Sequence, residues 1–384
     1  MIELSVLNWQ NRRATDPVAA AIAAYEQMEP EVRISQVIRP LSDFEHQGIE
    51  EVSKAHDIVI FDHPFSGAIE ASQCFLALDE ELLELTSHNA SESYIGPSLE
   101  TYRFRGRLWG LPIDGATQHA LVRQDLLAQL AADAPNNYSE VLALGRRARE
   151  KGLYLGTAIE TPHALMSILS YMANLGAPIE ANDEQLLAIP RESFKMAFDA
   201  VRAVLDMSPP EALGWNSIDL HEQMVARNDI VYAPVVYGYA TYGEADNKNR
   251  IGFGPFAGLS EPYHAGTAIG GTAMGVSRHR NNQSAALDFA RYMASDKVQK
   301  RLVAANHGQP SGLSGWQDSS MDTRYNGFFS VVAPTMEASW TRPRYKGYVQ
   351  FQYLAGEAIA YAIRSRQDAE VARQRLLELG GLSR

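Results

Sequence analysis

Several aromatic and short polar side chains follow predicted strands and could together bind a polyhydroxylated ligand. Aromatic rings stack on the apolar C–H faces of such a ligand, while carboxylate, guanidinium, imidazole and hydroxyl groups exchange hydrogen bonds with its hydroxyls. A buried hydroxyl without a partner would cost about 1 to 3 kcal/mol, so the site needs many short polar groups. The candidate ligand-binding residues are Trp9, Asp62, His63, Asp114, Trp215, Tyr237, Tyr239, Gly271, Thr272, Arg342 and Arg344.

The elements that must position the first of these residues alternate between strand and helix. Strands are predicted at 1–7, 32–38 and 57–61, with helices between them, the second over 41–54. Asp16 is expected to cap the first helix and Pro17 to open it. Such alternation predicts a mainly parallel sheet covered by helices on both faces. Ligands of such sheets bind beyond the carboxyl ends of the strands, where Trp9 and Asp62 stand.

The rest of the chain repeats this mixture of strands and amphipathic helices. Strands are expected at 153–157 and 230–234, and helices at 163–175, 194–205, 351–364 and 368–379. The strand at 230–234 leads into a loop that holds Tyr237 and Tyr239 with a glycine between them. In the helix at 351–364, the predicted inward face consists of Phe351, Leu354, Ala358 and Tyr361.

Three segments carry a resemblance to a known family. The first runs from the strand start Gly270-Gly271-Thr272 through an amphipathic helix and a short helix to His307-Gly308-Gln309-Pro310. The second is Arg105-Gly106-Arg107-Leu108-Trp109-Gly110-Leu111-Pro112 with the strand and helix after it, and the third is Arg342-Pro343-Arg344-Tyr345. In order and spacing they resemble the extracellular solute-binding proteins of family 1, the carbohydrate receptors of ABC importers that include the maltose-binding type. Arg123 stands where the family pattern has asparagine.

The resemblance implies an α/β periplasmic-binding-protein type II fold, with two lobes joined by hinge strands and a ligand cleft between them. The expected lobes are 1–115 with 271–316, and 116–270 with 317–384. The implied function is capture of a neutral or acidic sugar by a monomeric receptor whose lobes close on it. The implied partners are the permease subunits of an ABC importer. Gly271 and Thr272 would then serve either the hinge or the ligand.

Two features of the sequence bear on where the receptor acts. Members of this family act in the periplasm or outside the cell. The first residues read at once as a strand, without the basic, apolar and small-residue regions of an export signal, and we expect that the signal has been removed from this sequence. No apolar stretch approaches the roughly 20 residues of a membrane span.

Composition narrows the functional classes. The net charge of −12 disfavours nucleic acid as a partner, because binding phosphates requires a basic surface. Cys74 is the single cysteine and lies in an apolar run, which favours a buried small hydrophobic residue. No cofactor, metal site or catalytic motif is expected. Two alternatives remain: a receptor for an organic acid or another polar solute, and a glycosidase that uses carboxylates such as Asp62 and Asp114.

Overall fold

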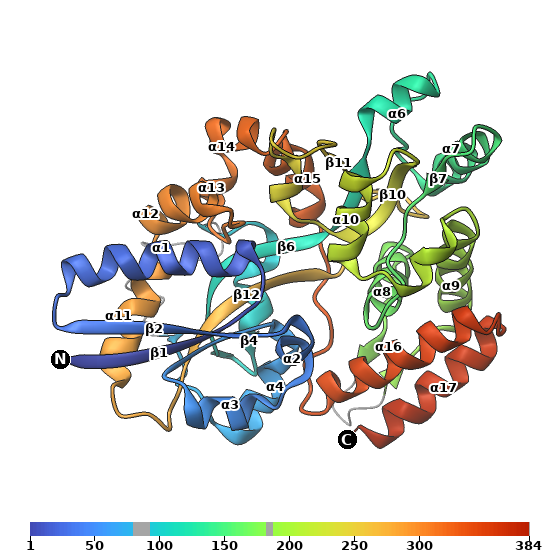
Figure 1. Cartoon of the computed structure of the whole chain (residues 1–384). Coiled ribbons are helices and arrows are strands. Elements are labelled where there is room, and N and C mark those ends of the chain that lie inside the picture. The colour runs from blue at the N-terminus through green and yellow to red at the C-terminus, as the bar shows by residue number, and fades with distance from the viewer. Residues whose placement is uncertain (80–92, 182–186, 384) are drawn as a thin grey trace. The chain divides into compact units, whose positions relative to one another are not determined.

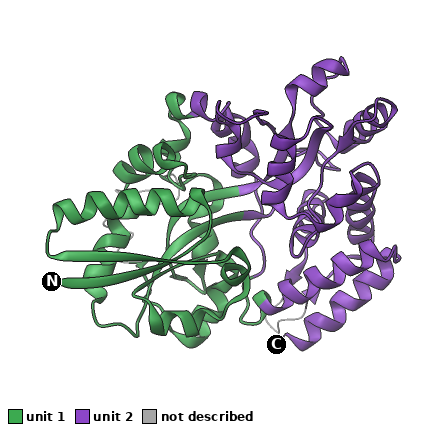
Figure 2. Cartoon of the chain, viewed as in Figure 1, with its two compact units in different colours: residues 1–116, 270–321, 344–349 green, residues 117–269, 322–343, 350–384 purple. Residues whose placement is uncertain are grey.

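The computed structural model describes residues 1–79, 93–181 and 187–383, which form two compact units (Figure 2). Unit 1 contains Met1–Ala116, Gly270–Met321 and Arg344–Val349, and unit 2 contains Thr117–Ile269, Asp322–Pro343 and Gln350–Arg384. The chain passes from one unit to the other inside two strands, β6 (Leu111–Val122) and β12 (Ile269–Val276). The short segment Arg344–Val349 returns to unit 1, a passage that the sequence analysis did not predict.

Unit 1 is a sheet with helices on both faces (Figure 1). Its strands are β1 (Ile2–Trp9), β2 (Val32–Arg39), β3 (Ile58–Phe61), the amino-terminal half of β6, most of β12, and the hairpin β4 (Arg103–Phe104) and β5 (Arg107–Leu108). Its helices are α1 (Arg12–Met28), α2 (Leu41–His46), α3 (Ile49–Ala55), α4 (Ser66–Ser72), α11 (Gln283–Ala294), α12 (Asp296–Val298), α13 (Leu313–Trp316) and the first half of α14 (Ser319–Arg324). The sheet order is β2-β1-β3-β12-β6. The helix predicted over 41–54 is interrupted between α2 and α3.

The first helix begins earlier than predicted. Its cap is Asn11, whose side chain accepts a hydrogen bond from the backbone N–H of Arg13 at 2.9 Å, while Pro17 lies inside the helix. The expectation that Asp16 caps the helix is therefore wrong, because Asn11 supplies the capping oxygen five residues earlier. This earlier start places Arg13 in the first turn of α1, and that position matters for the site described below.

Unit 2 packs its helices around a smaller set of strands. Its strands are the second half of β6, β7 (Tyr154–Leu155), β8 (Glu180–Ala181), β9 (Leu187–Ala188), β10 (Ile230–Tyr237) and β11 (Gly252–Gly254). Its helices are α6 (Gln124–Gln129), α7 (Tyr138–Glu150), α8 (His163–Asn174), α9 (Arg191–Asp206), α10 (Ser217–Ala226), α15 (Phe328–Glu337), α16 (Tyr348–Arg364, from Gln350) and α17 (Ala369–Leu382). β10 lies between β6 and β7, and β11 also pairs with β6. The predicted strands and helices of this part are confirmed.

The predicted inward face of α16 is wrong in part. Tyr361 is 63% exposed, whereas Ala355, Ile359 and Ile363 are buried. The neighbouring residues also pack closely at Gly356, where a Cβ would lie only 3.1 Å from the Cα of Pro162.

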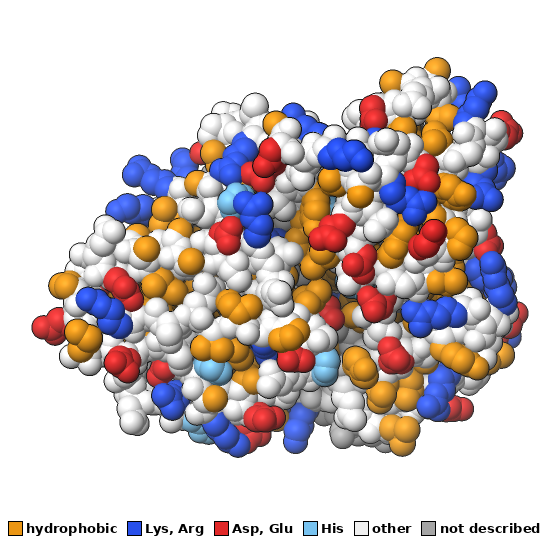
Figure 3. Space-filling view, in the orientation of Figure 1, with side chains coloured by type: hydrophobic (Ala, Val, Ile, Leu, Met, Phe, Trp, Pro, Cys, Tyr) orange, Lys and Arg blue, Asp and Glu red, His pale blue; other side chains and the backbone are white. Residues whose placement is uncertain are grey.

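The sequence analysis also predicted the burial of Cys74, the lack of a membrane span and a surface that is not basic. Cys74 is fully buried as predicted, and burial raises the pKa of its thiol. Within the described ranges, no helix is both long and apolar enough to cross a membrane. Lys and Arg side chains are interspersed with Asp and Glu on the face shown in Figure 3, so this face has no broad basic surface.

Candidate functional site

In unit 1, the candidate residues gather where strand ends meet at one edge of the sheet. β1 and β3 run parallel, and β12 runs antiparallel to β3 with Ala273 paired to Phe61. The carboxyl ends of β1 and β3 therefore lie beside the amino-terminal end of β12. This arrangement brings Trp9, Asp62 and Thr272 to the same edge, which is where an α/β sheet binds its ligands.

A buried ion pair lies at this edge. Arg13 of α1 donates two hydrogen bonds to Asp114 of β6, from Nε to Oδ1 at 2.8 Å and from Nη2 to Oδ2 at 2.6 Å. Arg13 is 5% exposed and Asp114 is 9% exposed. Two parallel hydrogen bonds between a guanidinium and a carboxylate fix both groups. Asp114 is thus held in one orientation by a residue that the sequence analysis did not single out.

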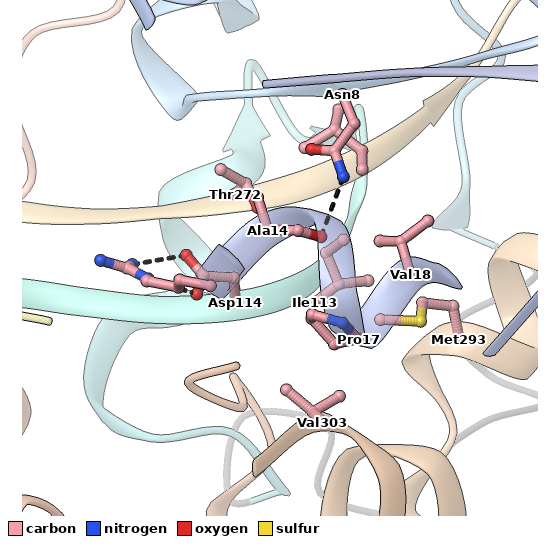
Figure 4. A pocket seen from close by; sticks show the side chains of 11 residues that line it. Asn8, Ala14, Pro17, Val18, Ile113, Asp114, Thr272, Met293 and Val303 are labelled. Atoms are coloured by element: carbon pink, nitrogen blue, oxygen red, sulfur yellow. Dashed lines mark hydrogen bonds and ion pairs between the residues drawn. The ribbon is translucent and has the colours of Figure 1, made fainter. Parts of the chain in front are cut away.

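A small cavity adjoins the ion pair (Figure 4). Its volume is about 10 Å³, room for a single water molecule at most. Asn8 lines it together with Thr272, and the Asn8 amide donates to the carbonyl of Ala14 at 2.9 Å. The cavity is too small for a sugar ring, so its lining residues are assigned to the packing that supports this edge of the sheet and not to a ligand site.

The backbone conformation and the packing of β12 against β6 require glycine at position 271. Its φ is +98°, which side chains with a Cβ rarely adopt, and a Cβ there would lie 2.3 Å from the carbonyl oxygen of Asp114. Its own carbonyl accepts a hydrogen bond from the Tyr102 hydroxyl at 3.0 Å. The glycine therefore allows β12 to approach β6 closely, while Thr272 beside it is buried.

Trp9, Asp62 and His63 differ in exposure at this edge. Trp9 is buried against Phe44, with ring centroids 5.5 Å apart, and its indole N–H has no hydrogen-bond partner among the described residues. One oxygen of Asp62 accepts from the backbone N–H of His63 at 2.8 Å and lies 2.8 Å from its Nδ1. His63 is fully buried and packs edge-on against Tyr102. Asp62 is the most exposed of the three.

In unit 2, the candidate residues follow β7 and β10, whose carboxyl ends lie together because the two strands are parallel. The backbone carbonyl of Trp215 accepts hydrogen bonds from the N–H groups of Ile159 and Glu160, which follow β7, at 2.9 and 3.0 Å. Tyr237 ends β10 and pairs with Gln118 of β6. Trp215 and Tyr237 therefore belong to one edge of unit 2, as Trp9 and Asp62 do in unit 1.

The tyrosine loop, defined as residues 237–243, packs against two histidines. A Cβ at Gly238 would lie 1.6 Å from Nε2 of His119, so only glycine fits there. Tyr239 is buried and meets the ring of His221 edge-on, with centroids 5.4 Å apart. Tyr242 lies on the same imidazole at 4.7 Å, and burial raises its pKa well above the usual range.

Arg342 and Arg344 do not form a pair. Arg342 lies in unit 2, where Nη1 donates to Gln352 at 2.8 Å and Nη2 to the carbonyl of Ile269 at 3.3 Å. Arg344 lies in unit 1 and donates from one nitrogen to the carbonyls of Glu100, Thr101 and Arg103, at 3.1, 2.8 and 2.7 Å. Both side chains hold backbone in place, and burial lowers the pKa of Arg344.

His163 is expected to make the stability of the folded protein depend on pH. It begins α8, is 5% exposed, and burial lowers its pKa to about 4 from the usual value near 6.5. The unfolded state then binds the extra proton between these values, so stability is lost as the pH falls from about 6.5 to about 4, by roughly 3 kcal/mol in total. Urea denaturation at pH 7.5 and 4.5 should show a smaller acid loss in His163→Gln than in the unsubstituted protein. An equal acid loss in both would contradict this assignment.

Sequence reasoning missed Arg13, His221 and Tyr242. Arg13 is separated from Asp114 by about a hundred residues, and His221 stands 18 residues before Tyr239, so no local spacing connects either pair. Tyr242 could have been found from the sequence, because it lies in the same tyrosine-rich loop as Tyr237 and Tyr239. Within the described part of the chain, no group of three or more His, Cys, Asp or Glu residues could hold a metal ion.

The sequence and the fold were compared with those of known proteins. The family model of the bacterial extracellular solute-binding proteins matches residues 41–315. Among solved structures, maltose-bound MalE3 of T. maritima is similar over 100% of both chains, with a TM-score of 0.84 and 14% identity. A solute-binding protein of Thermotoga lettingae bound with α-D-tagatose is similar over 100% of both chains (TM-score 0.82, 14% identity). Another from Agrobacterium radiobacter K84, in complex with ribitol, is similar over 99% of this chain and 98% of its own (TM-score 0.81, 16% identity).

These similarities confirm the predicted fold class, the two-lobed α/β fold of periplasmic binding proteins. No curated protein matches the chain. At identities of 14 to 16%, the similarity of the structures speaks for the fold and not for the ligand.

Proposed function

The chain belongs to the bacterial extracellular solute-binding proteins, and from this premise we propose that it captures a sugar by closure of its two lobes and delivers it to the permease of an ABC importer. The observation that carries the proposal is the composition of the two strand-end edges. Each combines tryptophan with hydrogen-bonding side chains: Trp9, Asp62 and Thr272 in unit 1, and Trp215 and Tyr237 in unit 2. The proteins of similar fold named above bind maltose, tagatose and ribitol. We place the receptor in the periplasm.

The ligand proposed here is neutral. A guanidinium could bind the carboxylate of an acidic sugar through two parallel hydrogen bonds. Arg342 and Arg344 instead donate to Gln352 and to backbone carbonyls, and Arg13 is bound to Asp114. Moving any of these guanidiniums to a ligand would leave buried acceptors unsatisfied, at about 1 to 3 kcal/mol for each acceptor.

Binding without catalysis is part of the proposal. A glycosidase requires one carboxylic acid that gives a proton to the leaving oxygen. Both oxygens of Asp114 already accept hydrogen bonds from Arg13, and one oxygen of Asp62 accepts from the backbone of His63. These contacts favour fixed carboxylates that accept hydrogen bonds from hydroxyls. An oligosaccharide incubated with the protein should be recovered intact.

Thermal shift with matched sugars tests the ligand class. Glucose, galactose, maltose, tagatose and ribitol are compared with glucuronate and galacturonate at equal concentration. At least one neutral compound is expected to raise the melting temperature, and no uronate should raise it as much as the neutral parent, because at equal concentration the ligand with the lower Kd stabilises the folded state more. A uronate that raises the melting temperature by at least as much as its parent would overturn the neutral assignment. If no compound shifts the melting temperature and native mass spectrometry of fresh protein finds no bound sugar mass, the sugar proposal itself fails.

A further inference from the structure

A single helix of unit 2 carries contacts to two candidate aromatic residues. α10 follows Trp215 directly, and Asn216 caps it by accepting hydrogen bonds from the N–H groups of Ile218 and Asp219 at 2.8 and 3.0 Å. The carboxylate of Asp219 accepts in return from the backbone N–H of Asn216 at 3.0 Å. This reciprocal capping box fixes the start of the helix. His221 stands one turn into the helix and is fully buried.

The contacts of His221 define its protonation state. Its Nδ1 lies 2.6 Å from the carbonyl oxygen of Ser217, and a carbonyl can only accept, so the proton sits on Nδ1. In the neutral ring, Nε2 is then an acceptor. It receives the backbone N–H of Tyr239 at 3.3 Å. One neutral tautomer therefore joins α10 to the tyrosine loop, with Tyr239 and Tyr242 packed on the ring.

We propose that His221 is a positioning residue that holds the tyrosine loop in its ligand-binding conformation. The proposal rests on the sugar-binding function proposed above. A side chain without an acceptor in the place of Nε2 would lose the hydrogen bond from the backbone N–H of Tyr239. Sugar affinity should therefore fall when this acceptor is removed.

Two substitutions at His221 separate hydrogen bonding from packing of the ring. His221→Gln keeps one donor and one acceptor, whereas His221→Phe keeps a ring and loses both hydrogen bonds. His279→Gln, at an exposed histidine of unit 1, is the matched control. Maltose, tagatose and ribitol are titrated in turn by calorimetry at pH 7.5.

For any of these sugars that binds, His221→Gln and the His279→Gln control should bind within about threefold of the unsubstituted protein, while His221→Phe should bind about tenfold more weakly, the effect of one lost buried hydrogen bond. Unchanged affinity in His221→Phe, or an equal loss in His221→Gln and His221→Phe, would overturn the positioning role.

Hydrogen exchange measured without sugar tests whether His221 holds the tyrosine loop, independently of whether the protein binds a sugar. Amide hydrogen exchange of residues 237–243 at pH 7.5 should be faster in His221→Phe than in the unsubstituted protein and in His221→Gln. Equal exchange in all three proteins would show that His221 does not hold the tyrosine loop. If none of the sugars binds but the exchange difference is found, the sugar proposal fails while the anchoring of the loop by His221 stands.

Discussion

Arg13→Ala is expected to lower the free energy of unfolding by about 3 to 5 kcal/mol, one of the two largest effects expected for this chain. Asp114 is 9% exposed, and the substitution removes the guanidinium that donates hydrogen bonds to both oxygens of its carboxylate. An uncompensated buried charge is costly because water cannot reach it. Urea denaturation followed by circular dichroism measures the change.

Two further variants separate the ion pair from general damage at the helix start. Arg12→Ala removes the neighbouring arginine, whose side chain is 62% exposed, and should change the free energy of unfolding by no more than about 0.5 kcal/mol. The double variant Arg13→Met with Asp114→Leu removes both charges and should be more stable than Arg13→Ala. If Arg13→Ala unfolds at the same urea concentration as Arg12→Ala, the pair does not stabilise the edge of unit 1.

This ion pair marks where sequence reasoning could and could not reach the site. Asp114 was a candidate because it follows the segment 105–112, which carries the family resemblance. Its partner Arg13 could not be found, because a helix start misplaced by five residues conceals which side chains point at the sheet. Asn11 and Asp16 are both good capping residues, and only the fold decides between them.

Arg342 and Arg344 show that residues close in sequence need not lie in the same unit. Arg342 and Arg344 are two residues apart, yet the chain passes from unit 2 to unit 1 between Pro343 and Arg344. Each side chain then satisfies carbonyls of its own unit. A sequence pattern gives no sign of such a passage, whereas strands and helices follow from the alternation and spacing of apolar residues within a short window.

The inward faces of helices could be predicted only in part from the spacing of apolar residues. In α11, which the sequence analysis predicts as an amphipathic helix, Ala286, Phe289 and Met293 share one face and are buried. In α16 the predicted face is right for Phe351, which is buried, and wrong for Tyr361, which is 63% exposed. The close approach of Pro162 to Gly356 on this helix is a contact that periodicity does not record.

Gly271→Ala is the second substitution with a large expected effect, about 3 kcal/mol or more of lost unfolding free energy. Two costs add at this position: a φ of +98°, and a Cβ placed 2.3 Å from the carbonyl oxygen of Asp114 and 3.3 Å from the backbone nitrogen of Ala116. Because the colliding atoms belong to the backbone of β6, the strands would have to separate. Urea denaturation compares the variant with the unsubstituted protein.

Two other glycines separate these costs. Gly106 has a φ of +76° with no atom within 4 Å of a built Cβ, so Gly106→Ala should cost only about 1 to 2 kcal/mol. Gly214 has neither a positive φ nor a close atom, and Gly214→Ala should change stability by no more than about 0.5 kcal/mol. A Gly271→Ala variant no less stable than Gly106→Ala would contradict the close approach of β12 to β6. If the expected order is found, the fold alone accounts for glycine at 271, and the case for a ligand at this edge rests on Thr272, Trp9 and Asp62.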